Sequence, residues 1–362
     1  MGAKILLAAG GTGGHLFPAF ALLEELKRRG ASVHVVTDER VDRYKADTAA
    51  DGMHVVPSAT VSGWNPFALL KTAMKLGDGY FKAKKLIKEL EPDFVLGFGG
   101  YPTFPPLHAA ADLGVPTGLH DQNAIMGRAN RMLARKVDVI ATCFESVKNL
   151  PEGVEGKVHL TGNPVRDKVL KVMDIPYPDF QHRIHLLIFG GSQGARFFSD
   201  MVPEALSYLD RELKSRLSVV QQCRPEDLMR VREVYQAAGI SANCQSFFDD
   251  LPAEMAAAHL IICRSGASTV AELAVCGRPA IMVPLPHALD NDQLLNARSL
   301  VDAGGGWIKE QKTIEAPRLA ERVTTLLSEP HLLQAAARNA KSMGRPDAVK
   351  ALADLVLARC GS

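Results

Sequence analysis

The chain has 362 residues, of which 47% are hydrophobic and 23% are charged, and its net charge is +2. This length favours two domains, and the balanced charge argues against a nucleic-acid binder. Its six cysteines lack metal-ligand spacing, which predicts reduced thiols rather than a disulfide framework or a zinc site. No stretch reaches the ~20 apolar residues of a membrane span, and the opening run KILLAA is too short for a signal peptide. We therefore expect a protein that stays inside the cell.

Short apolar runs alternate with amphipathic stretches along the first half of the chain. The run at 4–9 leads through glycines into a predicted helix near 16–29. Further strands are predicted at 32–38, 93–100, 116–120, 138–143 and 157–162. Apolar strands that alternate with helices are typical of a parallel sheet that is covered on both faces.

The same order of strand, glycine turn and helix starts again at residue 185. Strands are predicted at 185–190, 218–223, 244–248, 260–266 and 280–286. The pattern predicts an α/β protein of two doubly wound, Rossmann-like domains that face each other across a cleft. We expect domains at 1–162 and 163–345, a hinge within 161–169 at its Asn-Pro pair, and a last helix near 346–362 that packs back on the first domain.

Four turns rich in small residues follow predicted strands: GGTGGH, GFGGYPT, GGSQGAR and RSGASTVAE. Glycine lets the backbone approach a ligand closely, and helix N-termini attract phosphate. One such turn is as consistent with a plain strand-to-helix connection as with a binding site, but four favour a phosphorylated ligand. In RSGASTVAE, the hydroxyl groups and Glu272, expected in the first helical turn, favour a sugar nucleotide. A glutamate that only complements the helix dipole is the alternative interpretation.

A dinucleotide-binding oxidoreductase is a further alternative. Asp38 stands ~20 residues after the first glycines, where a Rossmann fold binds ribose. The third glycine of that fingerprint would fall at position 16, which is leucine. We therefore interpret Asp38 as the surface end of a strand.

Six segments in order resemble the N-acetylglucosaminyltransferase family of peptidoglycan assembly: GGTGGH, HDQN, GNPVR, GGSQGA, RSGASTVAEL and DNDQLLNA. The resemblance spans nearly the whole chain and implies a glycosyltransferase-B fold. The implied enzyme inverts the sugar as it moves GlcNAc from UDP-GlcNAc to the C4 hydroxyl of undecaprenyl-linked lipid I, giving lipid II for cell-wall synthesis, cell shape and division. Another UDP-sugar enzyme of this fold, an epimerase or a lipid glycosyltransferase, stays open.

The resemblance also implies which residues bind the substrates. The implied set is Thr12, Gly13, Gly14, Asn123, Arg166, Ser192, Phe248, Ala267, Ser268, Thr269, Val270, Ala271, Glu272 and Gln293. The first three would face the donor, and Asn123 would lie near GlcNAc. Arg166 and Ser192 would contact the nucleotide end, and Phe248 would cover uracil through its backbone and ring. Residues 267–269 would hold the diphosphate, Glu272 the ribose, and Gln293 the sugar hydroxyls, with Val270 and Ala271 beside them in the same binding stretch.

The transfer needs a base for the acceptor proton, and His15 at the tip of the first loop is our candidate. An ordinary imidazole pKa near ~6.5 suits that role at cytosolic pH. A structural histidine bonded to backbone is the alternative. His120 and Asp121 are second candidates, and His120 could serve only to hold the loop. The helix N-terminus after 264 and Arg166 would receive the leaving-group charge, so we expect no metal and no cofactor.

The stretch 64–90 carries six lysines against one aspartate and one glutamate, interleaved with aromatic residues. A pair of helices that packs on the core is the plain interpretation. The lysine excess also fits a surface that lies on anionic lipid headgroups. We therefore expect a peripheral protein on the cytoplasmic side of the cell membrane.

Overall fold

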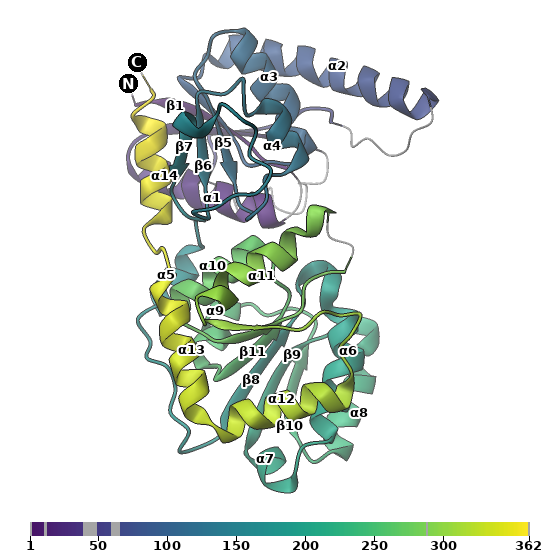
Figure 1. The fold of residues 1–362 in the computed structure, drawn as a ribbon. Helices are drawn as coiled ribbons and strands as arrows, with labels where there is room; N and C mark the ends of the chain where they lie inside the picture. The colour runs from purple at the N-terminus through teal and green to yellow at the C-terminus, as the bar shows by residue number, and fades with distance from the viewer. Residues whose placement is uncertain (1, 11–12, 39–48, 59–65, 287–288, 361–362) are drawn as a thin grey trace. The chain divides into compact units, whose positions relative to one another are not determined.

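The computed structural model describes residues 2–10, 13–38, 49–58, 66–286 and 289–360 (Figure 1). The chain forms two compact α/β units, Met1–Arg166 with Pro346–Ser362, and Asp167–Arg345. The division falls inside the segment 161–169. None of the helices in the described ranges combines the length and apolar composition needed to cross a bilayer.

The first unit is a seven-stranded parallel sheet with strand order β3-β2-β1-β4-β5-β6-β7. Its strands are β1 Lys4–Ala8, β2 Ser32–Thr37, β3 Gly52–Val55, β4 Phe94–Gly97, β5 Thr117–Asp121, β6 Val139–Thr142 and β7 Val158–Leu160. Its helices are α1 Gly13–Arg28, α2 Pro66–Leu90, α3 Phe104–Asp112, α4 Arg128–Leu133 and α14 Ala348–Leu357.

Helices cover both faces of this sheet, which explains why its strands are apolar without alternation. Ile5 of β1 belongs to a core cluster that includes Leu22 of α1 and Leu352 of α14. The next residue, Leu6, belongs to a second cluster that includes Ile87 of α2 and Leu107 of α3. The last helix of the chain therefore completes the core of the first unit.

The second unit is a six-stranded parallel sheet with strand order β10-β9-β8-β11-β12-β13. Its strands are β8 Ile184–Phe189, β9 Leu217–Gln222, β10 Ser241–Gln245, β11 Leu260–Cys263, β12 Ala280–Met282 and β13 Gly306–Ile308. Its helices are α5 Asp167–Val172, α6 Gly191–Ser207, α7 Arg211–Arg216, α8 Leu228–Ala237, α9 Leu251–Ala257, α10 Ala267–Cys276, α11 Asp292–Asp302, α12 Ala316–Ser328 and α13 Pro330–Ser342.

This sheet is also buried on both faces. Ile188 of β8 packs in a cluster with Phe198 of α6 and Val323 of α12. Its neighbour Phe189 packs in a cluster with Met255 of α9 and Leu273 of α10.

Several local predictions from the sequence are wrong in detail. The two edge strands β3 and β13 were not predicted, and the strand expected at 244–248 lies at Ser241–Gln245. The stretch expected as a helix pair is one helix over Pro66–Leu90. Asp38 is only 7% exposed, so it is not a surface strand end.

Candidate active site

In both sheets the strand order reverses beside the first strand of the unit. β1 lies between β2 and β4, and β8 lies between β9 and β11. Connections from such neighbouring strands leave in opposite directions, which opens a crevice outside their carboxyl ends where α/β proteins bind ligands. All four glycine turns of the sequence follow β1, β4, β8 or β11, so they stand at these two switch points.

His15 lies beside the switch point of the first unit. It is the third residue of α1, so it stands in the first helical turn rather than at the tip of the loop. Its Nδ1 is 3.1 Å from Oε1 of Gln122, which follows β5. Gly99 and Gly100, after β4, have φ values of +87° and +79°. Methyl groups there would lie 3.3 Å from Cε1 and 3.5 Å from Cδ2 of His15, so glycine lets this turn pack beside the imidazole.

Asp121 ends β5 with its carboxylate buried, and its side chain is bonded to the loop that follows. Its Oδ1 accepts from the backbone N–H of Asn123 over 3.1 Å. Its Oδ2 accepts from the backbone N–H of Gly127 over 3.0 Å and from Nδ2 of Asn130 over 2.9 Å. Burial raises the pKa of this carboxyl above its ordinary value, against the opposing effect of these donors. The contacts suit a group that positions Asn123.

His120, the neighbour of Asp121 on β5, is fully buried. Its Nδ1 lies 2.9 Å from Nε2 of Gln122, and its Nε2 lies 3.1 Å from the carbonyl oxygen of Gly162. Burial lowers the pKa of His120 to about 4, so the ring is neutral at pH 7. A ring held in this way anchors the loop.

The other implied residues of the first unit stand near its glycine turn and at Arg166, where its first chain segment ends. Gly13 and Gly14 begin α1, and a methyl group on Gly14 would have no neighbour within 4 Å among the described atoms. The guanidinium carbon of Arg166 lies 5.3 Å from the centre of the Phe17 ring. Thr12 lies outside the described residues.

In the second unit, helix α10 begins at the switch point. Its N-cap residue is Gly266, which has no side chain to accept hydrogen bonds from the first amide groups of the helix. Among the described residues, the buried Oγ of Ser268 has no hydrogen-bond partner. Val270 is 4% exposed and packs in the core, whereas Thr269 and Ala271 are partly exposed.

Glu272 is the sixth residue of α10, so the prediction that it stands in the first turn is wrong. The helix begins only at Ala267, because Gly266 keeps extended backbone angles of −60° and 148°. Glu272 is 6% exposed. A buried carboxylate in the second turn gains little from the helix dipole, so the dipole alone does not account for its position.

Arg264 supports the segment that follows β12. Its Nη1 donates to the carbonyl oxygens of Val283 and Pro284 over 3.0 and 3.3 Å, and its Nη2 donates to Oε1 of Gln311 over 2.7 Å. The guanidinium carbon is 5.0 Å from the ring centre of Phe198. Burial lowers the pKa of Arg264 to about 10.

Gln293, on α11, is hydrogen-bonded to the segment after β12 and to the turn after β11. Its Oε1 accepts from the backbone N–H of Leu285 over 3.0 Å, and its carbonyl oxygen accepts from Oγ of Ser265 over 2.8 Å. The side-chain oxygen thus accepts one hydrogen bond within the protein, and the NH₂ group gives the amide two donors in addition. Oδ1 of Asp292 accepts from the backbone N–H of Gln293 over 2.7 Å.

For two residues with an implied nucleotide contact, Phe248 and Ser192, the structure gives less information about the side chain. The ring of Phe248 is 8% exposed and packs with Phe189 in the core, so the backbone of Phe248 is what it can offer a base. The neighbouring Phe247 is 70% exposed. Ser192 stands in the first turn of α6, and its side chain lies outside the described part of the chain. Reasoning from the sequence gave no role to Gln122 or Arg264, although both stand in motifs that it quoted.

Two domain families match the chain. The glycosyltransferase family 28 N-terminal domain matches residues 5–142, and the glycosyltransferase family 28 C-terminal domain matches residues 185–352. A Brucella abortus (strain S19) protein is 50% identical over 356 residues, which cover 97% of this chain and 93% of that protein. It is named UDP-N-acetylglucosamine--N-acetylmuramyl-(pentapeptide) pyrophosphoryl-undecaprenol N-acetylglucosamine transferase.

Solved structures give the same picture of the fold. The crystal structure of Acinetobacter baumannii MurG is 29% identical, with a TM-score of 0.81 over 98% of this chain and 99% of that chain. The UDP-GlcNAc 2-epimerase of Neisseria meningitidis is 16% identical, with a TM-score of 0.67 over 98% of this chain and 100% of that chain. At that identity the likeness to the epimerase concerns the fold alone.

Proposed function

The chain belongs to the UDP-N-acetylglucosamine--N-acetylmuramyl-(pentapeptide) pyrophosphoryl-undecaprenol N-acetylglucosamine transferases, and we propose that it catalyses the reaction which makes lipid II. In this reaction the C4 hydroxyl of the muramyl sugar of lipid I attacks the anomeric carbon of UDP-GlcNAc. The new glycosidic bond forms as the bond to UDP breaks, and the anomeric centre inverts.

In this proposal the second unit binds the UDP-sugar. The main support is the N-terminus of helix α10. Its first amide groups lack a side-chain cap, and the buried hydroxyl of Ser268 has no partner among the described residues. Phosphate oxygens would accept from such groups, and the helix dipole favours their negative charge. Residues 267–269 would therefore hold the diphosphate, with Glu272 on the ribose and Gln293 on the GlcNAc hydroxyls. The backbone of Phe248 and the start of α6 at Ser192 would complete the nucleotide site.

The first unit supplies the acceptor side. His15 would take the proton of the acceptor hydroxyl as the glycosidic bond forms. Asn123 would lie at the GlcNAc ring, and the carboxylate of Asp121 would position it by accepting from its backbone N–H over 3.1 Å. The α1 glycines would leave space beside the donor. Negative charge that develops on departing UDP would be stabilised by the α10 amide groups and by Arg166, so the proposal includes no metal step.

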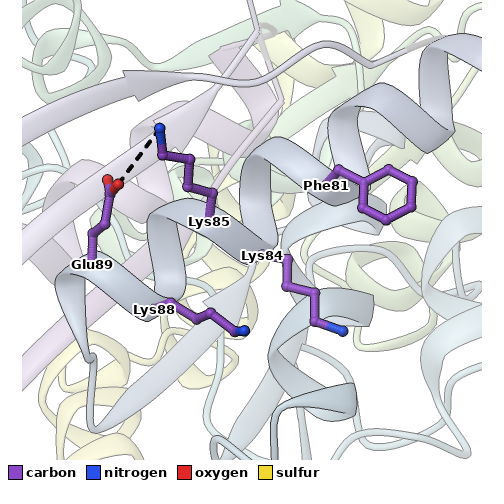
Figure 2. Close-up of a pocket in the computed structure, with 5 residues that line it drawn as sticks. All are labelled: Phe81, Lys84, Lys85, Lys88 and Glu89. Atoms are coloured by element: carbon purple, nitrogen blue, oxygen red, sulfur yellow. Dashed lines mark ion pairs between the residues drawn. The ribbon is translucent and has the colours of Figure 1, made fainter.

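We further propose that helix α2 holds the protein on the cytoplasmic face of the membrane. Figure 2 shows Phe81, Lys84, Lys85 and Lys88 projecting from α2, with Glu89 paired to Lys85. Their spacing of three and four residues places these four side chains along one helix face. Phe81 is 70% exposed, and the side chain of Lys85 is 78% exposed. An exposed aromatic ring among lysines suits an interface of anionic headgroups and acyl chains.

The opposite side of α2 packs on its own unit. Ala83 and Ile87 are buried in the core cluster, and the hydroxyl of Tyr80 donates to Oδ2 of Asp112 on α3 over 2.9 Å. Tyr80 thereby fixes α2 to α3, and it also contacts Lys84, whose Nζ lies 5.5 Å from the centre of the Tyr80 ring. Trp64 lies outside the described residues.

A transfer assay tests the reaction. The full chain is incubated with radiolabelled UDP-GlcNAc and a soluble lipid I analogue, and the product is identified by mass and by its β1→4 linkage. Calorimetric titration with UDP-GlcNAc, UDP-glucose and NADH tests the donor. We expect transfer and a preference for UDP-GlcNAc. Conversion of UDP-GlcNAc to its 2-epimer without acceptor, or binding of NADH alone, would contradict the proposal.

A further inference from the structure

A hydrogen-bonded relay joins His15 to the core of the first unit through the side-chain amide of Gln122. Gln122 is 3% exposed and His120 is 0% exposed, so the protein supplies their partners. Oε1 of Gln122 is 3.1 Å from Nδ1 of His15, and Nε2 of Gln122 is 2.9 Å from Nδ1 of His120. The orientation of this one amide therefore determines where the protons lie on two imidazole rings.

The backbone fixes the orientation of the amide. Nε2 of Gln122 also lies 3.1 Å from the carbonyl oxygen of His120, which can only accept, so this end must be the NH₂ group. The same NH₂ group faces Nδ1 of His120, which must then accept and carries no proton. The proton of neutral His120 is left for Nε2, which lies 3.1 Å from an acceptor, the carbonyl oxygen of Gly162. A pKa of about 4 keeps this ring neutral at pH 7.

The same reasoning continues to His15. The atom that Gln122 presents to it is Oε1, which has no hydrogen, so Nδ1 of His15 must be the donor across their 3.1 Å contact. A neutral imidazole carries one proton, and its other nitrogen, Nε2, then holds the lone pair. A methyl group on Gly100 would lie 3.6 Å from Nε2, so glycine at this position keeps a side chain of its own away from that edge of the ring.

We propose that Gln122 is a positioning residue that holds neutral His15 in the Nδ1–H tautomer, so that Nε2 is the atom that accepts the proton of the acceptor hydroxyl. His120 and the Gly162 carbonyl hold the amide in turn. This inference rests on the proposed function for the role of His15 as base, whereas the tautomer itself does not depend on it. The opposite tautomer would turn an N–H toward the hydroxyl and could not remove its proton.

The wild-type tautomer is measured directly. Long-range ¹H–¹⁵N spectra of the full chain with ¹⁵N-labelled histidine distinguish Nδ1–H from Nε2–H rings without any substrate. The chain has 11 histidines, and the His15 signals are identified by their loss in His15→Asn. We expect Nδ1–H for neutral His15. An Nε2–H pattern in the wild-type chain would overturn the proposal, and this test needs no variant of Gln122.

Gln122→Met tests the cause, because methionine keeps an unbranched side chain of similar length without the amide. We expect His15 to shift toward the Nε2–H tautomer and kcat to fall roughly 10- to 100-fold, with KM for UDP-GlcNAc within about twofold of wild type. Cys143→Ala is the matched control, because Sγ of Cys143 lies 3.4 Å from Nε2 of His120, on the side of that ring away from the Nδ1 atom that meets the amide. It should keep the wild-type tautomer and kcat.

The outcomes separate this inference from the function on which it rests. A His15 tautomer or a kcat that is unchanged in folded Gln122→Met would overturn the positioning role. A wild-type chain with the Nδ1–H pattern but without GlcNAc transfer would support the tautomer assignment and count against the proposed function.

Discussion

The guanidinium of Arg264 donates to the carbonyl oxygen of Val283 over 3.0 Å, at a position where Arg264 is only 7% exposed. The turn that opens RSGAST, directly after β11, is thereby tied to the segment that leads to Gln293. The buried charge of Arg264 thus fixes the backbone at Val283. This contact connects the turn before α10, where the diphosphate contacts are predicted, with the segment before Gln293, where the sugar contact is predicted.

Replacing Arg264 by methionine should loosen this segment. The substitution leaves the carbonyl oxygens of Val283 and Pro284 without their donor, and removal of a buried charge offsets part of that cost. We expect the free energy of unfolding to fall by about 1–3 kcal/mol in urea denaturation, and UDP-GlcNAc to bind several-fold more weakly in calorimetry. Arg318→Met is the control, because Arg318 forms an exposed pair with Glu321. Equal effects of the two substitutions would show that Arg264 does not support the loop.

His120 should make the stability of the first unit depend on pH. Its pKa is about 4 in the folded chain and near the ordinary 6.5 when unfolded, because burial disfavours the imidazolium. Between these two pH values the unfolded chain therefore binds more protons than the folded chain. The contribution of neutral His120 to the free energy of unfolding is complete above pH 6.5 and is lost as the pH falls toward 4. A difference of this size corresponds to roughly 3 kcal/mol.

The measurement is the free energy of unfolding at several pH values for wild type, His120→Asn and His331→Asn. The His331 side chain is 73% exposed, so its replacement should preserve the wild-type slope. The His120 variant should lose less stability than wild type between pH 6.5 and 4. Parallel curves for wild type and the His120 variant would contradict the predicted cause.

Glu272→Ala should weaken UDP binding at least tenfold while the fold stays intact. The reason is the loss of a charge-assisted hydrogen bond to the ribose, which is on the order of 1.5–3 kcal/mol. Glu272→Gln keeps the shape and one acceptor, so an intermediate affinity is expected. Calorimetry with UDP gives the comparison, and circular dichroism checks the fold. Unchanged UDP affinity in the alanine variant would remove Glu272 from the donor site.

The parallel sheets could be predicted from the sequence because their central strands are buried on both faces. Runs such as KILLAA and HLLIFG have no polar alternation, and both lie in the middle of their sheets as β1 and β8. The edge strand β3, Gly52–Val55, lacks such a run and has residues that are partly or fully exposed. β10 is likewise mostly polar, and the apolar Phe247–Phe248 pair that follows it misplaced the predicted strand.

The glycine turns in the sequence predicted where a binding site would form. They did not predict which hydrogen bonds position the side chains of that site. The order of HDQN gives no sign that Gln122 contacts His15, because those residues are 107 positions apart and meet only when β1 and β5 stand in one sheet. Whether Glu272 stands in the first or the second turn of α10 depends on the residue at which the helix begins, and the extended backbone of Gly266 sets that residue. Both features depend on tertiary contacts.

His15→Ala should lower kcat by roughly 10²- to 10⁴-fold, the range for removal of a general base. Donor affinity should stay nearly the same, because the α10 site does not include His15. Steady-state kinetics with a lipid I analogue and calorimetry with UDP-GlcNAc separate the two effects. His331→Ala, at an exposed position, is the control. Near-normal turnover would return His15 to a structural role, and an equal loss of affinity would assign it to donor binding.

Helix α2 should bind the enzyme reversibly to anionic vesicles. Each lysine near such a surface contributes about 1 kcal/mol, and the attraction fades within a Debye length as salt rises. Replacing Lys84, Lys85 and Lys88 by glutamate should release the protein from vesicles that contain anionic lipid, and Phe81→Ala should weaken binding with less change in salt dependence. UDP-GlcNAc affinity should not change, because the proposed donor site belongs to the other unit.

The control for this experiment has the same change in net charge at a different place. Arg211, Lys312 and Arg338 are exposed residues of the second unit, and their replacement by glutamate removes three positive charges and adds three negative ones. If docking depends on α2, this variant should co-sediment with anionic vesicles far better than the α2 variant does, and neither should bind neutral vesicles strongly. Equal release of both variants would mean that overall charge governs the attraction. Retention of the α2 variant at the wild-type level would place the docking surface elsewhere, because the lysines beside Phe81 would then have no part in it.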